Sequence, residues 1–273
     1  MIRWLLAVLL ISLSGPVAAR DLTVMTFNIR LPINSDGVNR WEARRDVAAA
    51  MIRRAAPDVI GMQELFRRQG EDLIARLPSY RWIGIDRRGG SGDEHMGIFY
   101  RADRLRVERW GNFWLSDTPD VAGSISWGHP YPRMVTWAIF ADRSGGRFAV
   151  FNTHLPYRAE DEAAREKGVT LLLSRIGPIA GTLPVVVTGD FNTIPDSAIH
   201  RRMASGLRDL WETTAVRRGP AETFHNFTGT PDRRIDWMFA RGFTATQVET
   251  ITDYRGAVYP SDHYPVVAKL RRE

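Results

Sequence analysis

The sequence predicts an α/β fold in which two packed, mostly antiparallel sheets carry helices on their outer faces. Short strand-like runs alternate with helix-like runs along the chain, and Gly or Pro residues separate them. Many strands and few long helices favour two packed sheets over a single doubly wound sheet. Both halves repeat the strand–helix–strand order without a low-complexity linker, so we expect one domain over residues 20–273.

The individual elements follow from periodicity. Alternation predicts a strand over residues 22–28, and apolar residues at helical spacing predict a helix over 41–55 that ends before Pro57. We expect a turn at Ser144-Gly145-Gly146 between two strands of the second half. The other expected strands are 58–63, 80–85, 96–100, 134–140, 148–152, 185–188, 235–239 and 266–270, and the other expected helices are 71–77 and 159–176.

The first 19 residues have the pattern of a secretory signal peptide. Arg3 precedes an apolar run over residues 4–13, and Val17-Ala18-Ala19 supplies small residues before Arg20. The apolar run is shorter than the roughly 20 residues that a membrane-spanning helix needs. We therefore expect cleavage near Ala19 and a periplasmic or secreted protein. The chain has no cysteine, so an exported form must derive its stability from a core rather than from disulfides.

Charge and motifs narrow the classes of function. The formal net charge of +6 and the pI near 10.0 permit an anionic partner such as nucleic acid, acidic lipid or a phosphoester. The arginines occur as scattered pairs, such as Arg44-Arg45 and Arg201-Arg202, which is typical of solvated faces rather than of one binding stripe. No H-E-x-x-H or G-x-S-x-G motif occurs, so zinc peptidases and serine hydrolases have no support.

Unusual polar residues recur where the expected strands begin or end. Singly, such residues are most often turn or surface residues. Strand ends on one edge of a sandwich converge, however, so we expect the set to line one cleft. An oxygen-rich, thiol-free set suits Mg²⁺, or Mn²⁺, better than zinc. The set comprises Asn28, Glu64, His154, Asp190, Asn192, Asp236, Asp262 and His263.

Six segments carry a resemblance to a known family. They read TFNIR, IGMQE, NTHL, GDFNTIPD, RIDWMF and SDHYPVVAKL, and they span the chain from Leu22 to Leu270. Their order and spacing resemble the endonuclease/exonuclease/phosphatase family of metal-dependent phosphoesterases, which includes pancreatic deoxyribonuclease, apurinic endonucleases and bacterial sphingomyelinases. The resemblance implies a four-layered α/β sandwich, in agreement with the two-sheet prediction.

The resemblance also implies a role for each polar residue. Glu64 is the expected main Mg²⁺ ligand, Asn28 assists by hydrogen bond or coordination, and Asp262 joins the metal shell or structures its loop. Asp236 is expected to orient His263, which lies at the scissile phosphate and either activates water or stabilises charge. The remaining implied roles concern the water and the phosphate: Asp190 orients or deprotonates the attacking water, Asn192 fixes it, and His154 donates to a phosphoryl oxygen.

The substrate is less well defined by the sequence. Export argues against DNA repair and inositol signalling, so we expect hydrolysis of phosphodiester bonds in small or lipid-derived substrates by a monomer, with transient membrane-surface contact for a lipid. The alternatives are an extracellular nuclease, a phosphomonoesterase and a non-catalytic binding protein. Further candidates near a pocket, for which structural roles are equally expected, are Trp110, Phe113, Trp114, Trp127, His129, Tyr131, Arg133 and His225.

Overall fold

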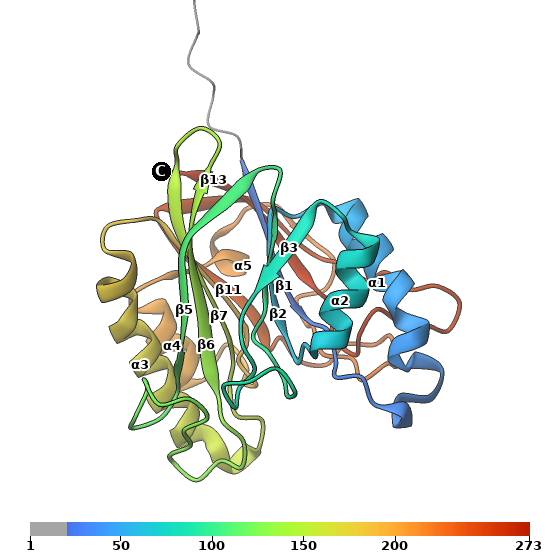
Figure 1. The fold of residues 1–273 in the computed structure, drawn as a ribbon, viewed down its shortest axis with the longest axis horizontal. Helices are drawn as coiled ribbons and strands as arrows, with labels where there is room; N and C mark the ends of the chain where they lie inside the picture. Colours follow the sequence, from blue (N-terminus) through green and yellow to red (C-terminus); the bar gives the residue numbers. More distant parts are fainter. Residues whose placement is uncertain (1–20) are drawn as a thin grey trace, which may run out of the picture.

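A computed structural model describes residues 21–273, and the predicted signal peptide lies outside the described residues. Two sheets pack face to face, and helices cover the outer face of each, α1 and α2 on one side and α3 and α4 on the other (Figure 1). The predicted four-layered α/β sandwich is confirmed. Most neighbouring strands are antiparallel, as expected, but both sheets are mixed.

The first sheet has the strand order β10-β12-β13-β1-β2-β4-β3. Within it β1 pairs parallel with β2 and antiparallel with β13. Its strands are β1 (Leu22–Asn28), β2 (Val59–Gln63), β3 (Tyr80–Ile83), β4 (Ile98–Arg101), β10 (Arg217–Arg218), β12 (Phe243–Thr250) and β13 (Val266–Arg272).

The second sheet has the strand order β5-β6-β7-β8-β11-β9. Here β7 pairs parallel with β8, and β11 pairs antiparallel with β8. Its strands are β5 (Leu105–Trp114), β6 (Met134–Asp142), β7 (Arg147–His154), β8 (Val185–Asp190), β9 (Arg208–Asp209) and β11 (Asp236–Arg241).

Three apolar layers separate the four structural layers. One lies between the sheets, one between the first sheet and its helices, and one between the second sheet and its helices. Over residues 21–273, every helix is too short or too polar to span a lipid bilayer. The helices are η1 (Asn34–Asn39), α1 (Trp41–Ala55), α2 (Arg67–Arg76), η2 (Ala159–Asp161), α3 (Glu162–Ala180), α4 (Ala198–Ala204) and α5 (Leu210–Thr213).

The alternation of side chains in the central strands decides which polar residues point between the sheets. In β1, Met25 and Phe27 pack under the helices, while Val24 packs between the sheets. Since successive side chains of a strand point to opposite faces, Asn28 shares the inward face with Val24. The same parity puts the last residues of β7 and β8 and the first residue of β11 on the inward face.

Several elements differ from the sequence-based expectation. Helix α2 begins at Arg67 instead of near residue 71, and β5 and β12 were not expected. In β5, Arg106 and Arg109 are exposed, and the strand lies at the edge of its sheet, so no apolar run marks it. In β12 threonines and other polar residues occupy the partly exposed face, which removes the same signal.

A buried polar layer joins the two sheets below the ends of β1, β2, β7 and β8. The amide nitrogen of Gln63 donates to Asn152 Oδ1 at 2.6 Å, and Thr188 Oγ1 donates to the same atom at 3.0 Å. Gly61 makes this approach possible, because a Cβ there would lie 2.0 Å from Thr188 Oγ1 and 2.6 Å from Asn152 Oδ1. The closest contact between the sheets therefore requires glycine.

We predict that Gly61→Ala destabilises the fold by roughly 1–3 kcal/mol, because an added methyl group overpacks this layer. Thermal and urea unfolding measure the effect. Gly92→Ala is the matched control, since a Cβ at Gly92 meets nothing within 4 Å. If Gly61→Ala unfolds at the same temperature and urea concentration as the wild type, the two sheets do not meet at Gly61 as described.

Candidate active site

Strand direction brings the candidate side chains to one edge of both sheets. Because β1 and β2 run parallel, Asn28 at the end of β1 lies beside Glu64, which directly follows β2. Likewise β7 and β8 run parallel, and their register pairs His154 with Asp190. Strand β11 is antiparallel to β8, so its first residue, Asp236, lies opposite Asp190.

Asn28 connects the two sheets at this edge. Its Nδ2 donates to Asp190 Oδ2 at 2.9 Å and to Glu64 Oε1 at 3.3 Å. Its Oδ1 accepts from the N–H of Arg30 at 3.0 Å, and Glu64 Oε2 accepts from the N–H of Leu31 at 2.9 Å. In this geometry Asn28 contacts Glu64 by hydrogen bonding, which is one of the two roles expected for it.

Asp190 is the centre of the group. Its Oδ2 lies 3.5 Å from His154 Nε2 and 3.9 Å from His263 Nε2. Its Oδ1 accepts from the N–H of Asn192 at 3.0 Å, and the Nδ2 of Asn192 donates to the carbonyl of Leu155 at 3.0 Å. With that nitrogen engaged, the amide oxygen of Asn192 is the group left to hold a water.

His263 is oriented by Asp236. The Nδ1 of His263 donates to Asp236 Oδ2 at 2.8 Å, and Thr223 Oγ1 donates to the same oxygen at 2.6 Å. Nε2 is thereby turned toward Asp190, at a distance too long for a direct hydrogen bond. Sequence reasoning missed Thr223, which lies in a loop with no local catalytic signal.

The pKa values of Asp190 and His263 are both raised above those of the exposed side chains. Burial, followed by the charge of Asp236, raises the pKa of Asp190 to about 7. Burial opposes protonation of His263, but the charge and hydrogen bond of Asp236, with Asp262 and Asp190, outweigh it and raise its pKa to about 10. The geometry thus favours a protonated His263 facing a carboxyl group that titrates near neutral pH.

Asp262 takes a different orientation from its neighbour His263. Its Oδ1 accepts from Ser261 Oγ at 3.2 Å, and its Oδ2 lies 3.7 Å from Arg30 Nη1. The loop is held by the fully buried Arg44, which donates to the carbonyls of Ile29 and Pro260 at 2.6 and 3.1 Å. A place for Asp262 in a metal shell stays a prediction.

Glu94 is a further acidic residue of the site that sequence reasoning missed. Its Oε2 lies 4.0 Å from His154 Nδ1 and 2.9 Å from Arg87 Nη1. Glu94 and Arg87 belong to the same loop, which is closed around Asp86. The Asp86 carboxylate accepts hydrogen bonds from four backbone N–H groups of this loop. Burial, then the charge of Glu64, raises the pKa of Glu94 to about 7.

A divalent cation fits the chemistry of this edge. One ligand atom each from Asp190, Asp236 and His263 lies within 4.8 Å of the others, and among residues 21–273 no hydrogen-bond partner reaches Asp236 Oδ1. The raised pKa values of Asp190 and Glu94 are expected where buried carboxylates crowd together. This closest cluster is not the predicted ligand set, but Asn28 connects it to the half-buried Glu64.

A second cluster of His200, Asp209 and Glu212 has ligand atoms within the same distance of one another. Here Arg234 already supplies the positive charge, with Nη1 2.9 Å from Asp209 and Nη2 2.8 Å from Glu212. This cluster is an ion-pair network that packs α4 and α5 against β11. Because Arg234 already neutralises these carboxylates, this cluster is a less favourable cation site than the group around Asp190.

The aromatic residues singled out in the sequence divide between two roles. Phe113 and Trp114 are buried, and Trp114 Nε1 donates to the carbonyl of Arg87, so both are packing residues. Trp110 is exposed on the edge strand β5. Tyr131 also contacts Arg87, whose guanidinium carbon lies 4.7 Å from its ring centre.

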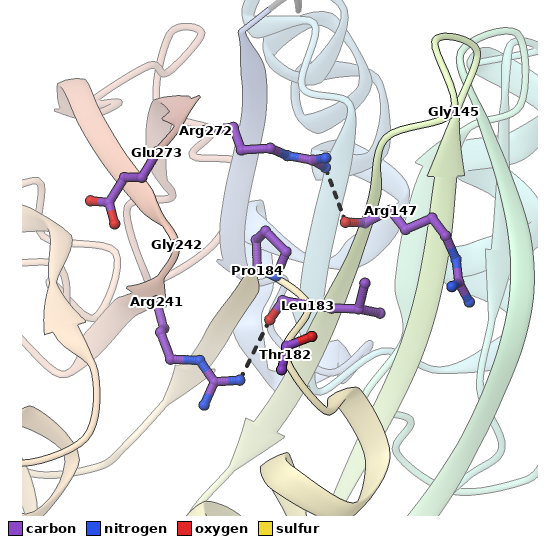
Figure 2. Close-up of a pocket in the computed structure, with 9 residues that line it drawn as sticks. All are labelled: Gly145, Arg147, Thr182, Leu183, Pro184, Arg241, Gly242, Arg272 and Glu273. Carbon is purple, nitrogen blue, oxygen red and sulfur yellow. Dashed lines mark hydrogen bonds between the residues drawn. The ribbon is translucent and has the colours of Figure 1, made fainter.

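A pocket of about 580 Å³ lies away from these groups (Figure 2). It contains Arg147, the first residue of β7, and Arg241, the last residue of β11, whereas the catalytic edge holds the other end of each strand. At roughly 3.3 Å per residue, the length of β7 alone separates the two sites by about 23 Å. Two of its arginines, Arg241 and Arg272, donate to the carbonyls of Leu183 and Arg147 (Figure 2).

Comparison with known proteins gives one family and several relatives. The model of the Endonuclease/Exonuclease/phosphatase family matches residues 25–263. A solved endonuclease/exonuclease/phosphatase from Bacteroides vulgatus is 34% identical with a TM-score of 0.89, and the match covers 93% of this chain and 100% of that one. A mannosyl-6-phosphatase from Bacteroides thetaiotaomicron is 33% identical with a TM-score of 0.86, covering 92% and 99%. The uncharacterized protein L388 of Acanthamoeba polyphaga mimivirus is 27% identical over 251 residues, covering 84% of this chain and 92% of its own.

We predict that Asp236→Asn lowers the pKa of His263 by about 1 to 3, because the carboxylate that stabilises the imidazolium is lost. In the metal-free wild type the imidazole should stay protonated well above neutral pH, and in the variant it should lose its proton at a pH lower by about 1 to 3, closer to neutral. An NMR pH titration of the histidine side chains measures this. Asp232→Asn, which changes an exposed carboxylate, is the control. An unchanged His263 titration in Asp236→Asn would contradict the pairing.

Proposed function

The chain belongs to the endonuclease/exonuclease/phosphatase family, and we propose that it is an exported, Mg²⁺-dependent hydrolase of small phosphoesters. Hydrolysis of phosphoesters follows from the family. The observation that supports this chain's own catalytic competence is the hydrogen-bonded pair of Asp236 and His263 facing Asp190 across 3.9 Å. A secreted, non-catalytic binding protein would not need an acid and a base held opposite one another.

Metal binding is proposed at Glu64, with Asn28 beside it and Asp262 as the third predicted member. Mg²⁺ commonly uses only one or two protein carboxylates and keeps its other positions for water and phosphate oxygens. When bound, the cation supplies positive charge that polarises the phosphoryl group and stabilises charge as the reaction proceeds. Mn²⁺ has the same ligand preference and is the expected substitute.

The protein side chains provide proton transfer and positioning. We assign Asp190 as the group that accepts the proton of the attacking water, with Asn192 holding that water. His263 keeps its proton through Asp236 and stabilises the negative charge that develops on the phosphoryl group. His154 lies 3.5 Å from Asp190 and is assigned to a non-bridging phosphoryl oxygen.

Two ester classes have support. A phosphodiester in a small or lipid-derived molecule was the first expectation, and it rests on export. The mannosyl-6-phosphatase, 33% identical over nearly the full length of both chains, supports the monoester alternative with a small sugar phosphate as substrate. Nucleic acid and membrane lipids also contain phosphoester bonds and are proposed only as alternative substrates. The active form is proposed to be a monomer.

Export is proposed from the first 19 residues, which combine Arg3, an apolar run and the small residues before Arg20. We predict that the protein isolated outside the cytoplasm begins at or near Arg20. N-terminal sequencing measures this, and an intact Met1 on that material would contradict the proposal.

The direct test of the function is hydrolysis of p-nitrophenyl phosphate and bis(p-nitrophenyl) phosphate by the purified protein with Mg²⁺, Mn²⁺, Ca²⁺ or EDTA. We predict metal-dependent hydrolysis of at least one ester, abolished by EDTA. His263→Ala should lose on the order of a thousandfold in rate, as expected for a group that acts in acid–base and charge stabilisation. Thermal melting controls for folding of the variant. Equal turnover by the wild type and a folded His263→Ala protein would contradict the assignment.

A further inference from the structure

Arg133 is a buried cation without a partner. It directly precedes β6, and only 4% of its surface is exposed. Across residues 21–273, no carboxylate oxygen lies within the 4.0 Å of an ion pair, and no acceptor reaches its Nη1. Withdrawing a guanidinium from water without a partner carries a large desolvation cost. Such a cost is commonly retained where a ligand supplies the missing anion.

Arg133 lies on the catalytic side of the molecule. Burial lowers its pKa, and the charges that act on it most strongly are those of Glu94, Arg87, Glu64 and Asp190, in that order. After burial, Arg133 is also the largest influence that lowers the pKa of His154. The strand register gives the same placement, because Val135 of β6 pairs with Thr153 of β7, and the carbonyl of Met134, the residue after Arg133, accepts from Thr153, the residue before His154. Arg133 therefore lies at the end of the sandwich that holds His154.

Glu94, the acidic residue with the strongest electrostatic effect on Arg133, does not form an ion pair with it. Glu94 is already paired with Arg87, whose Nη1 lies 2.9 Å from Glu94 Oε2. The same arginine also lies 3.0 Å from Asp93 and stacks on Tyr131. Arg87 thus supplies the ion pair of Glu94 and leaves the guanidinium of Arg133 available.

The backbone holds Arg133 in place. Its carbonyl accepts from the N–H of Leu115 at 2.7 Å, and the next carbonyl, that of Met134, accepts from Thr153 Oγ1 at 3.0 Å. Nearby, His129 is fixed by its Nδ1 contact with the carbonyl of Tyr131 at 2.6 Å. A guanidinium on such a rigid support is preorganised for an anion, which lowers the entropic cost of binding.

We propose that Arg133 binds a terminal oxygen of the substrate phosphate and so makes the site favour dianionic phosphomonoesters over monoanionic phosphodiesters. The inference rests on the proposed hydrolysis of phosphoesters at Asp190 and His263. A monoester has three terminal oxygens and close to two negative charges at neutral pH, whereas a diester has two terminal oxygens and one charge. Hydrogen bonds between two charged groups are stronger than hydrogen bonds between neutral groups. The guanidinium therefore distinguishes a monoester from a diester through the additional terminal oxygen and the additional negative charge of the monoester.

The test compares Arg133→Met with the wild type on p-nitrophenyl phosphate, bis(p-nitrophenyl) phosphate and inorganic phosphate. For the monoester, kcat/KM should fall about 10- to 100-fold, the effect expected for a hydrogen bond to a charged group. For the diester it should fall several-fold less. The inhibition constant of inorganic phosphate should rise by about the same factor as the monoester loss.

Stability separates binding from a structural role. Methionine has a similar length and no charge, so Arg133→Met should melt at the same temperature as the wild type or higher when no ligand is present. A structural arginine would give a lower melting temperature and equal losses on both esters, which would overturn the proposal. Arg133→Lys keeps the charge without the planar fork and should retain part of the phosphate affinity. It also serves if the methionine variant does not fold.

The matched control is Arg109→Met, because Arg109 is exposed on β5 and stacks on Trp137, with its guanidinium carbon 5.6 Å from the ring centre. This variant should leave the ratio of monoester to diester hydrolysis unchanged. A wild type inactive on both esters would overturn the proposed function itself. A wild type active only on the diester, or an unchanged ratio in Arg133→Met, would overturn the role of Arg133 alone.

Discussion

The site depends on one hydrogen bond between the sheets, from Asn28 at the end of β1 to Asp190 at the end of β8. That bond forms because two pairs of parallel strands end at the same edge with the same inward parity. Beneath it, the Gln63–Asn152–Thr188 layer holds the sheets at a fixed separation. Asn28, His154, Asp190 and Asp236 are therefore positioned by strand register. The loop residues His263 and Asn192 are held by hydrogen bonds to Asp236 and Asp190, and such fixed positions suit a reaction that requires precise geometry.

The electrostatics of this edge favour the binding of a divalent cation and a phosphate. Acidic groups are brought together at low exposure, and burial raises the pKa of both Asp190 and Glu94. In the proposed site, a divalent cation beside Glu64 would lower that repulsion, and a bound phosphate would balance the charge of the cation, Arg133 and His263. Burying the carboxylates without a cation, or the guanidinium without an anion, costs free energy. That cost is offset when metal and phosphate bind together.

Much of this could be predicted from the sequence, because the signals were local. Asn28, His154 and Asp190 each end an apolar run, and strand parity alone places them inward. Glu94 could not be identified in this way, and the sequence marks Arg133 only as a pocket candidate for which a structural role is equally expected. The importance of both residues comes from contacts with residues far away in the chain. Glu94 sits in a polar loop, and Arg133 looks like an ordinary residue before a strand. Their roles follow from burial and from missing partners, which no sequence pattern encodes.

The same limit explains the elements that were not expected. Strands β5 and β12 are stabilised by pairing with β6 and β13, and their own side chains are largely polar on the exposed face. For such strands the hydrogen-bond partners, not the apolar pattern, decide the structure. Nor does local sequence show which arginines gather at the pocket opposite the catalytic edge, because its lining comes from the ends of four separate strands.

The central claim is that one edge of the sandwich binds both a divalent cation and a phosphate. Anomalous scattering from crystals soaked with Mn²⁺ and inorganic phosphate tests it most directly. The account predicts an anomalous peak at the Glu64 carboxylate and a phosphate in contact with His154, His263 and Arg133. A peak at the His200, Asp209 and Glu212 cluster, or a phosphate bound only in the pocket around Arg147 and Arg241, would contradict it.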